Sequence, residues 1–133
     1  MIDLHSHILP GLDDGSSSMS ISIEMARMAA DDGITHMACT PHITPGVYNN
    51  NTQMIRVGVE ALQAAIDEAG IALQLVIGAD IHVAPDLITK LSQGFVPTIS
   101  SSRYFLFEPP HHVRPPNLGR FAQELIKHDF VPI

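Results

Sequence analysis

The chain has 133 residues, a hydrophobic content of 45% and a formal net charge of −7 at pH 7. This length and apolar content suffice for one small soluble domain with its own core. Only 7 residues are lysine or arginine, so we expect no nucleic-acid partner. No apolar run approaches the roughly 20 residues of a membrane helix, and no secretory signal opens the chain, so the expected location is cytoplasmic.

Apolar strand-like runs alternate with helical stretches along the chain. The predicted strands cover residues 1–4, 34–40, 73–79, 104–108 and 130–133. The predicted helices run from Ser18 or Ser20 to Gly33, and over about residues 52–69, 85–91 and 115–128. Strands separated by helices indicate right-handed crossovers and a parallel sheet or barrel of the α/β class.

Two of the predicted helices have one apolar face each. The first carries Ile21, Met25, Met28 and Ala29, and the second carries Ile55, Val59, Leu62 and Ile66. The single cysteine, Cys39, lies in a predicted strand, where we expect it to pack in the core. A cysteine-dependent phosphatase loop needs an arginine six positions after the cysteine, and that position is Pro45.

Side chains that bind divalent metals are concentrated near the N-terminus, in the segments DLHSH, DD and TPH. Alternate side chains of a strand point the same way, so Asp3, His5 and His7 share a face while Leu4 turns to the packed side. One strand end can therefore offer two imidazoles to a metal. Asp13, Asp14 and His42 belong to the other two segments.

The candidate ligands follow the ends of the predicted strands, where ligands gather in parallel sheets. These residues are His5, His7, His42, Asp80 and Glu108. Mixed histidine and carboxylate ligands suit Mn²⁺, Fe²⁺ or Zn²⁺. Such ions can hold phosphate oxygens and activate water, so an acidic chain with few cationic side chains can still act on a phosphate ester.

The remaining histidines and arginines have weaker claims to the site. We expect His82 to be a loop residue or a neighbour of the ligands, His111 and His112 to be solvated, and His36 and His128 to be structural. Arg103 and Arg114 are candidates for a phosphate contact, although a lone loop arginine is usually only solvated.

The segments MIDLHSHILPGLDDGS, CTPHITPG, GADIH and FLFEPP resemble the PHP (polymerase and histidinol phosphatase) superfamily, most of all the manganese-dependent protein-tyrosine phosphatases of bacterial capsule and exopolysaccharide operons. The resemblance implies a distorted (βα)₇ barrel, of which this chain would supply about five βα units. It also implies about three metal ions. The implied substrate is phosphotyrosine on the autokinase that controls polysaccharide export.

Carried over by position, His5 and His7 match the first metal pair, His42 the second motif and Glu108 the carboxylate that ends a strand. Asp14 matches an acidic residue near a metal, which is a candidate proton donor to the leaving phenolate. Asp80 stands where a glutamate is common. Its shorter side chain favours binding of at least one metal over bridging of two.

Later motifs of the superfamily, which supply further histidine, arginine and aspartate, do not occur in the sequence. We therefore interpret residues 1–133 as one N-terminal domain portion of a longer phosphatase. A portion with two open sheet edges is expected to be poorly soluble or oligomeric, to bind metal weakly and to turn over little substrate. The alternatives are a phosphoesterase for a small molecule such as histidinol phosphate, and a non-catalytic metal-binding fragment.

Overall fold

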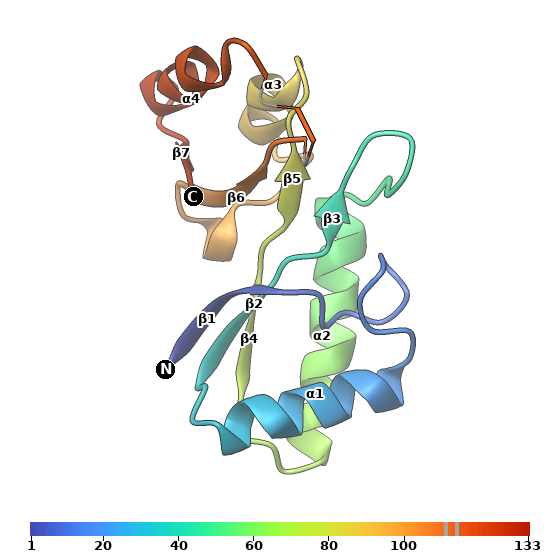
Figure 1. Ribbon diagram of the computed structural model, residues 1–133. Coiled ribbons are helices and arrows are strands. Elements are labelled where there is room, and N and C mark those ends of the chain that lie inside the picture. Colours follow the sequence, from blue (N-terminus) through green and yellow to red (C-terminus); the bar gives the residue numbers. More distant parts are fainter. Residues whose placement is uncertain (111, 114) are drawn as a thin grey trace.

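The computed structural model describes residues 1–110, 112–113 and 115–133. Its strands are β1 (Ile2–Ser6), β2 (His36–Cys39), β3 (His42–Ile43), β4 (Gln74–Ile77), β5 (Asp80–His82), β6 (Tyr104–Glu108) and β7 (Val131–Pro132). Its helices are α1 (Met19–Asp31), α2 (Thr52–Glu68), α3 (Leu87–Ser92) and α4 (Leu118–Lys127), with a short 3₁₀ helix, η1 (Ile99–Ser101). The chain therefore has a mixed α/β fold, as its alternating pattern predicts (Figure 1).

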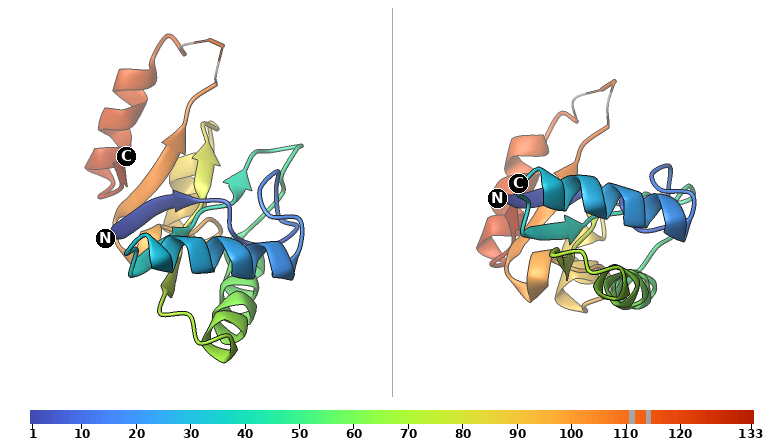
Figure 2. Two further views of the ribbon diagram at one scale, coloured as in Figure 1. Left: turned by 60° about the horizontal axis from the view of Figure 1, so that its bottom comes forward. Right: turned by 90° about the horizontal axis from the view of Figure 1, so that it is seen from below.

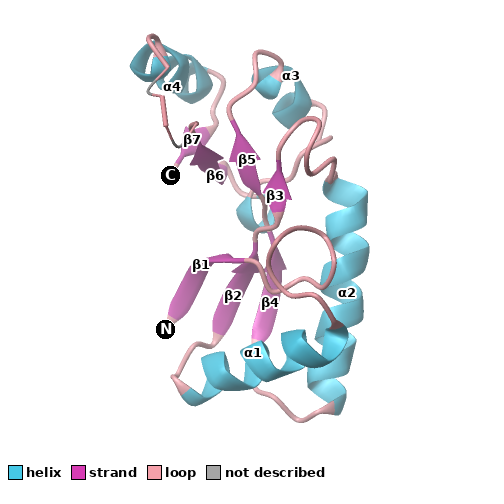
Figure 3. Ribbon diagram, turned by 45° about the vertical axis from the view of Figure 1, so that its right-hand side comes forward, coloured by secondary structure: helices cyan, strands magenta, loops and turns pink. Residues whose placement is uncertain are grey.

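All paired strands run parallel, in the orders β1-β2-β4 and β3-β5-β6-β7. The two sheets meet where β2 continues into β3 and β4 continues into β5 (Figure 3). Backbone hydrogen bonds cross this junction, from Gly78 N to Cys39 O at 3.1 Å and from Asp80 N to Pro41 O at 3.1 Å. The junction is therefore a bend in two neighbouring strands, across which their pairing continues.

Thr40 and Gly78 lie at this bend, where the hydroxyl group of Thr40 is paired. The hydroxyl of Thr40 is buried and accepts a hydrogen bond from Ser6 N at 2.9 Å. A Cβ atom at Gly78 would lie 3.0 Å from the Thr40 methyl group, closer than side chains normally pack. A side chain at position 78 would therefore press on Thr40, which would have to shift by a few tenths of an ångström.

One buried core cluster joins the β1-β2-β4 sheet and the first two helices to Leu91 of α3, Phe105 of β6 and Leu125 of α4. Helix α2 packs on β4, and α1 packs on α2 (Figure 2). The predicted face of α2 is confirmed, because Ile55, Leu62 and Ile66 are fully buried and Val59 packs against them. Asn51 caps this helix by accepting from Met54 N at 3.1 Å.

The predicted face of α1 is partly wrong. Ile21 and Met28 are exposed, and the buried residues are Ser22, Ala26 and Ala29. These small side chains are spaced at i, i+4 and i+7, so they share a face and let α1 approach its neighbours closely. The hydroxyl of Ser22 donates to the carbonyl of Ile8 at 2.6 Å, which explains how a polar residue occupies the packed side.

Three further expectations change at the strands. Leu4 was expected to be packed, but it is exposed, because β1 is the edge strand of its sheet and the helices pack elsewhere. No strand is predicted between residues 40 and 52, but β3 forms at the start of this segment. Asp80 follows β4, as expected, but it also opens a further strand, β5, which lies beyond the predicted third strand. Cys39 is buried in the core as expected, and burial raises the pKa of its thiol to about 12.

In the part of the chain that the structure describes, no helix is both long and apolar enough to cross a membrane. The strand Tyr104–Glu108 has the predicted bounds, and α4 and β7 occupy the predicted segments with shorter limits.

We expect Leu62→Ala to lower the free energy of unfolding by about 2–5 kcal/mol, because the leucine side chain is fully buried between α2 and the sheet. Met28→Ala removes a side chain of similar size that is exposed, so it should change stability by less than about 0.5 kcal/mol. Urea titrations followed by circular dichroism would measure both values. Equal losses would contradict the packing described for α1.

Candidate metal centre

The residues expected to bind metal lie together at the bend between the two sheets. His5 lies near the end of β1, and His7 directly follows this strand. His42 and Asp80 face each other in the register of β3 and β5, and Glu108 ends β6 on the other side of β5. The parallel arrangement thus brings residues that are distant in sequence to one edge (Figure 3).

Three overlapping groups have ligand atoms within 4.8 Å of one another. They are His5, His7 and Asp80; His7, Asp14 and His42; and His42, Asp80 and Glu108. The Nε2 atoms of His5 and His7 are 3.1 Å apart, and Oδ2 of Asp80 lies 3.5 Å from His5 Nε2. All six side chains named by the sequence as ligands or proton donor are therefore brought together.

His42 connects two of these groups. Its Nδ1 atom lies 3.3 Å from Oε2 of Glu108 and 3.5 Å from Oδ2 of Asp80, while its Nε2 atom lies 3.7 Å from Oδ1 of Asp14. A neutral imidazole has one lone pair. His42 can therefore serve the group with Asp80 and Glu108, or the group with His7 and Asp14, through one nitrogen at a time.

The environment of His42 shows that these residues fit a cation. Its Nδ1 atom is buried and has no hydrogen-bond partner among the described residues. A buried polar atom without a partner costs free energy, and the two carboxylates beside it repel each other. A divalent ion at this position would relieve both costs, and imidazole and carboxylate are ligands that Mn²⁺, Fe²⁺ and Zn²⁺ accept.

Burial and neighbouring charge also act on Asp80. Burial, followed by the negative charge of Glu108, raises the pKa of the Asp80 carboxyl, and the histidines nearby only partly oppose this. The ionised form of Asp80 is thus disfavoured in the metal-free protein. A bound cation would reverse this balance.

The imidazole of His7 has a partner of its own. Its Nδ1 atom lies 2.7 Å from Oδ2 of Asp13, and this hydrogen bond raises the pKa of His7. Burial alone would raise the pKa of Asp13, but its hydrogen bonds with His7, Gly15 and His42 lower it overall. Asp13 is therefore an ionised acceptor, and His7 donates through Nδ1.

The loop that follows His7 turns back tightly to place Asp13 and Asp14. Ser16 N donates to His7 O at 3.0 Å and Gly11 N donates to Ser16 O at 2.8 Å. A Cβ atom at Gly15 would collide with the carbonyl oxygen and the Cβ atom of His7. This glycine is therefore required for the loop to close over His7.

Other residues considered from the sequence lie outside the three groups. Asp3 accepts a hydrogen bond from His5 N at 3.0 Å, and Asp13 binds His7, so neither acts as a ligand in this arrangement. His82 lies next to the cluster, with its Nδ1 atom 3.8 Å from Oε2 of Glu108. Arg103 pairs with Asp129 at 3.0 Å.

Three of the remaining histidines are exposed. His36 and His128 are exposed away from the bend, and His112 is exposed in the loop after β6. His111 and Arg114 lie outside the described residues. Sequence reasoning overlooked Asn50, whose buried side chain donates to His42 O, because an asparagine in a turn-rich segment carries no metal signal.

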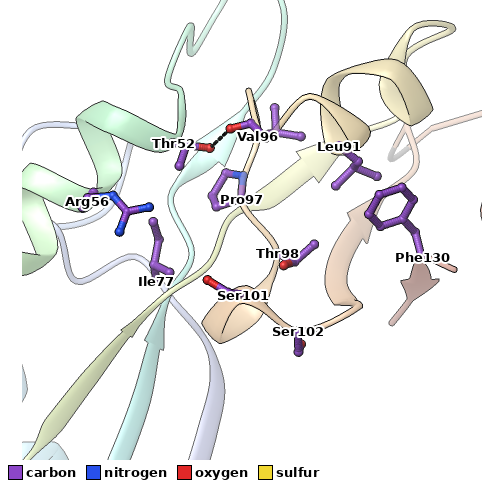
Figure 4. A pocket seen from close by; sticks show the side chains of 11 residues that line it. Thr52, Arg56, Ile77, Leu91, Val96, Pro97, Thr98, Ser101, Ser102 and Phe130 are labelled. Carbon is purple, nitrogen blue, oxygen red and sulfur yellow. Dashed lines mark hydrogen bonds between the residues drawn. The ribbon is translucent and has the colours of Figure 1, made fainter.

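A separate pocket of about 260 Å³ lies beside α2 and η1 (Figure 4). Arg56, Thr98 and Ser101 are among the residues that line it. None of its described lining residues is a histidine or a carboxylate, so it is not the metal centre.

The sequence model of the capsular polysaccharide synthesis CpsB/CapC family matches residues 1–133. The chain belongs to this family. It is 33% identical to tyrosine-protein phosphatase YwqE of Bacillus subtilis, over 94% of the chain and 48% of that protein. It is 28% identical to putative tyrosine-protein phosphatase CapC of Staphylococcus aureus, over 100% of the chain and 52% of that protein.

The fold agrees with a solved structure from the crystallographic work on YwqE of Bacillus subtilis and CpsB of Streptococcus pneumoniae, described as metal-dependent tyrosine phosphatases. The TM-score is 0.94 at 31% identity, over 99% of the chain and 53% of that structure. The resemblance to capsule-operon phosphatases is thus confirmed. The chain spans about half the length of the curated relatives it matches.

We expect Asp80→Asn to raise the melting temperature of the metal-free protein by a few degrees, about 1 kcal/mol for a domain of this size. The raised pKa means that the ionised carboxylate destabilises the empty site, and asparagine removes that charge. The gain should be full at pH 8 and should shrink as the pH falls through the raised pKa, because aspartic acid then becomes neutral too.

Scanning calorimetry with a chelator, at pH 8 and at mildly acid pH, would measure this gain. Asp86→Asn is the matched control, because Asp86 is exposed and pairs only with Lys90 at 3.0 Å. A lower melting temperature for Asp80→Asn at pH 8 would contradict the electrostatic account.

Proposed function

We propose that this chain carries the metal-binding part of a protein-tyrosine phosphatase that hydrolyses phosphotyrosine as a phosphoric monoester. The observation that supports the proposal most is the meeting of three overlapping ligand groups at one sheet edge, in a chain of the CpsB/CapC family. YwqE, CapC and CpsB are named as tyrosine-protein phosphatases, although CapC only as a putative one.

His5, His7, His42, Asp80 and Glu108 would hold the metal, and Mn²⁺ is the ion we propose. When bound, such ions neutralise the charge of the phosphate and lower the pKa of a water molecule. Asp80 belongs to two of the ligand groups, since its Oδ2 atom lies 3.5 Å from both His5 Nε2 and His42 Nδ1. This placement supports the binding of metal by Asp80 in both groups, despite its short side chain.

Asp14 would donate the proton to the leaving phenolate oxygen. Its carboxyl is 65% exposed, more than those of Asp80 and Glu108, and reaches toward His42 from the loop after His7. It therefore stands at the solvent side of the cluster, where a large aryl ester can approach. An exposed carboxyl can also regain its proton from solvent between turnovers.

We further propose that the parallel strands belong to a PHP barrel, that the protein acts in the cytoplasm, and that its substrate is the tyrosine autokinase of capsule or exopolysaccharide export. The continuous strand order across the bend and the family membership support the barrel and the pathway. In residues 1–133 taken alone, the unpaired edges of β1 and β7 would favour a homo-oligomer, whereas a closed barrel would pair them.

A chimera tests the function directly. Residues 1–133 replace the matching half of YwqE, and the chimera is assayed with Mn²⁺ on a phosphotyrosine peptide and on histidinol phosphate, with residues 1–133 assayed alongside. We expect hydrolysis of the peptide by the chimera. Preferred hydrolysis of histidinol phosphate would favour a small-molecule phosphoesterase, and Mn²⁺ binding without turnover would favour a non-catalytic role.

In this chimera, His7→Ala should reduce peptide hydrolysis to background with little loss of folding. His7 belongs to two of the three groups, so its loss removes about a quarter to a third of a typical inner shell in each. His36→Ala is the matched control, because His36 is exposed on β2 away from the bend. Activity of His7→Ala near that of the parent, with saturating Mn²⁺, would refute the assignment.

Asp14→Asn should slow hydrolysis of the phosphotyrosine peptide by about 10²–10⁴-fold. It should slow hydrolysis of an aryl phosphate with a strongly acidic phenol far less, because that leaving group departs without a proton. Initial rates on both substrates would measure the difference. Equal losses would indicate that Asp14 acts on the metal and not on the leaving group.

A further inference from the structure

Two of the proposed metal ligands, which come from different strands, are held by the same buried carboxylate. The side chain of Asp13 is 0% exposed. Its Oδ2 atom lies 2.7 Å from Nδ1 of His7 and accepts from the backbone N–H of His42 at 2.9 Å. Its Oδ1 atom accepts from Gly15 N at 2.9 Å. Asp13 thus joins the loop after β1 to the start of β3.

Asn50 holds the same segment from the other side. Its side chain is buried, and its Nδ2 group donates to His42 O at 2.9 Å and to Leu12 O at 2.8 Å. The backbone of His42 is therefore bound at its N–H by Asp13 and at its carbonyl by Asn50. Both contacts lead to neighbouring residues of one loop, Leu12 and Asp13.

We propose that Asp13 and Asn50 are positioning residues that fix His7 and His42 relative to each other for metal binding, without binding metal themselves. Asp13 is absent from the three ligand groups although it touches a member of them. Asn50 directs both of its N–H donors to backbone oxygens, which places it in contact with the backbone of His42 and not with the ligand atoms. The proposal rests on the metal-binding role given to His7 and His42 above.

The geometry explains why such a pair of residues is needed. Because Nδ1 of His7 donates to Asp13, its Nε2 atom carries the lone pair, and that atom lies 3.1 Å from Nε2 of His5. β3 spans only His42–Ile43, so the strand itself holds His42 weakly. The two side chains supply the constraint that a two-residue strand cannot. Carboxylate partners of ligating histidines typically contribute about 10–100-fold in metal affinity.

The test compares the YwqE chimera with its Asp13→Ala and Asn50→Ala variants. Mn²⁺ affinity is measured by isothermal titration calorimetry, and the tautomer of His7 by ¹⁵N NMR of the metal-free protein at alkaline pH. Asp31→Asn and Asn49→Ala are the controls, because Asp31 and Asn49 are exposed residues outside the cluster. Circular dichroism with a chelator reports whether each variant folds.

We expect Asp13→Ala to weaken Mn²⁺ binding by about 10–100-fold and to shift the proton of His7 from Nδ1 toward Nε2. Asn50→Ala should weaken binding while the tautomer of His7 stays as in the parent, because Asp13 remains. The two variants thus separate the effect of changing the His7 tautomer from the effect of displacing His42. If Asp13→Ala does not fold, the Mn²⁺ affinity of Asn50→Ala still tests the proposal.

Mn²⁺ affinities within about twofold of the parent in either folded variant would overturn the proposal, whatever the tautomer of His7. The Mn²⁺ affinities of the parent and of the His7→Ala variant show whether the proposed function itself has failed. If the parent binds no Mn²⁺, the metal role itself is wrong, whereas normal binding by Asp13→Ala in a parent that binds Mn²⁺ refutes only the positioning role.

Discussion

Asp80 and Glu108 lie on neighbouring strands with the imidazole of His42 against both, and this crowding is the constraint on which the site depends. Both carboxylates approach the same buried nitrogen, at 3.5 and 3.3 Å. Burial raises the pKa of Asp80, and the negative charge of Glu108 raises it further, because two like charges in a partly buried position repel each other. An arrangement of this kind is unfavourable for the empty protein and favourable for a cation, which links metal affinity to the stability of the fold.

The bend in the sheet is what creates this crowding. Straight strands would present their ends along one line, whereas here β2 and β4 turn at Thr40 and Gly78 and continue as β3 and β5. His42 and Asp80 therefore begin new strand segments just beyond the bend, opposite the end of β1. Gly78 packs closely against Thr40, so a side chain at position 78 would press on this part of the bend, two residues before Asp80.

The sequence predicted that these side chains would meet, because a strand has a simple period and parallel strands share an edge. The pattern DLHSH placed His5 and His7 side by side, and the same rule brought His42, Asp80 and Glu108 to them. Periodicity failed where burial depended on tertiary partners. Met28 looked like a core residue and is exposed, while Ser22 is buried because its hydroxyl finds the carbonyl of Ile8.

The role of Asp13 was not predictable from spacing alone. Asp13 and Asp14 are adjacent and chemically identical, yet Asp13 is fully buried against His7 while Asp14 is exposed at the mouth of the cluster. Their different exposure results from the way the loop closes at Gly15, and this closure depends on three-dimensional contacts with His7.

The three-residue ligand groups are compatible with the catalytic role proposed for the metal. A structural site closes its coordination shell with protein atoms, usually four for zinc, whereas a catalytic site leaves a position for water or substrate. Each group here brings together three side chains. The side chain of His5 is 55% exposed, so the cluster opens to solvent on that side. Asp14 is also exposed, and it lies beside His42 in another of the groups. A substrate that reaches this carboxyl from solvent would therefore also reach the proposed metal ligands.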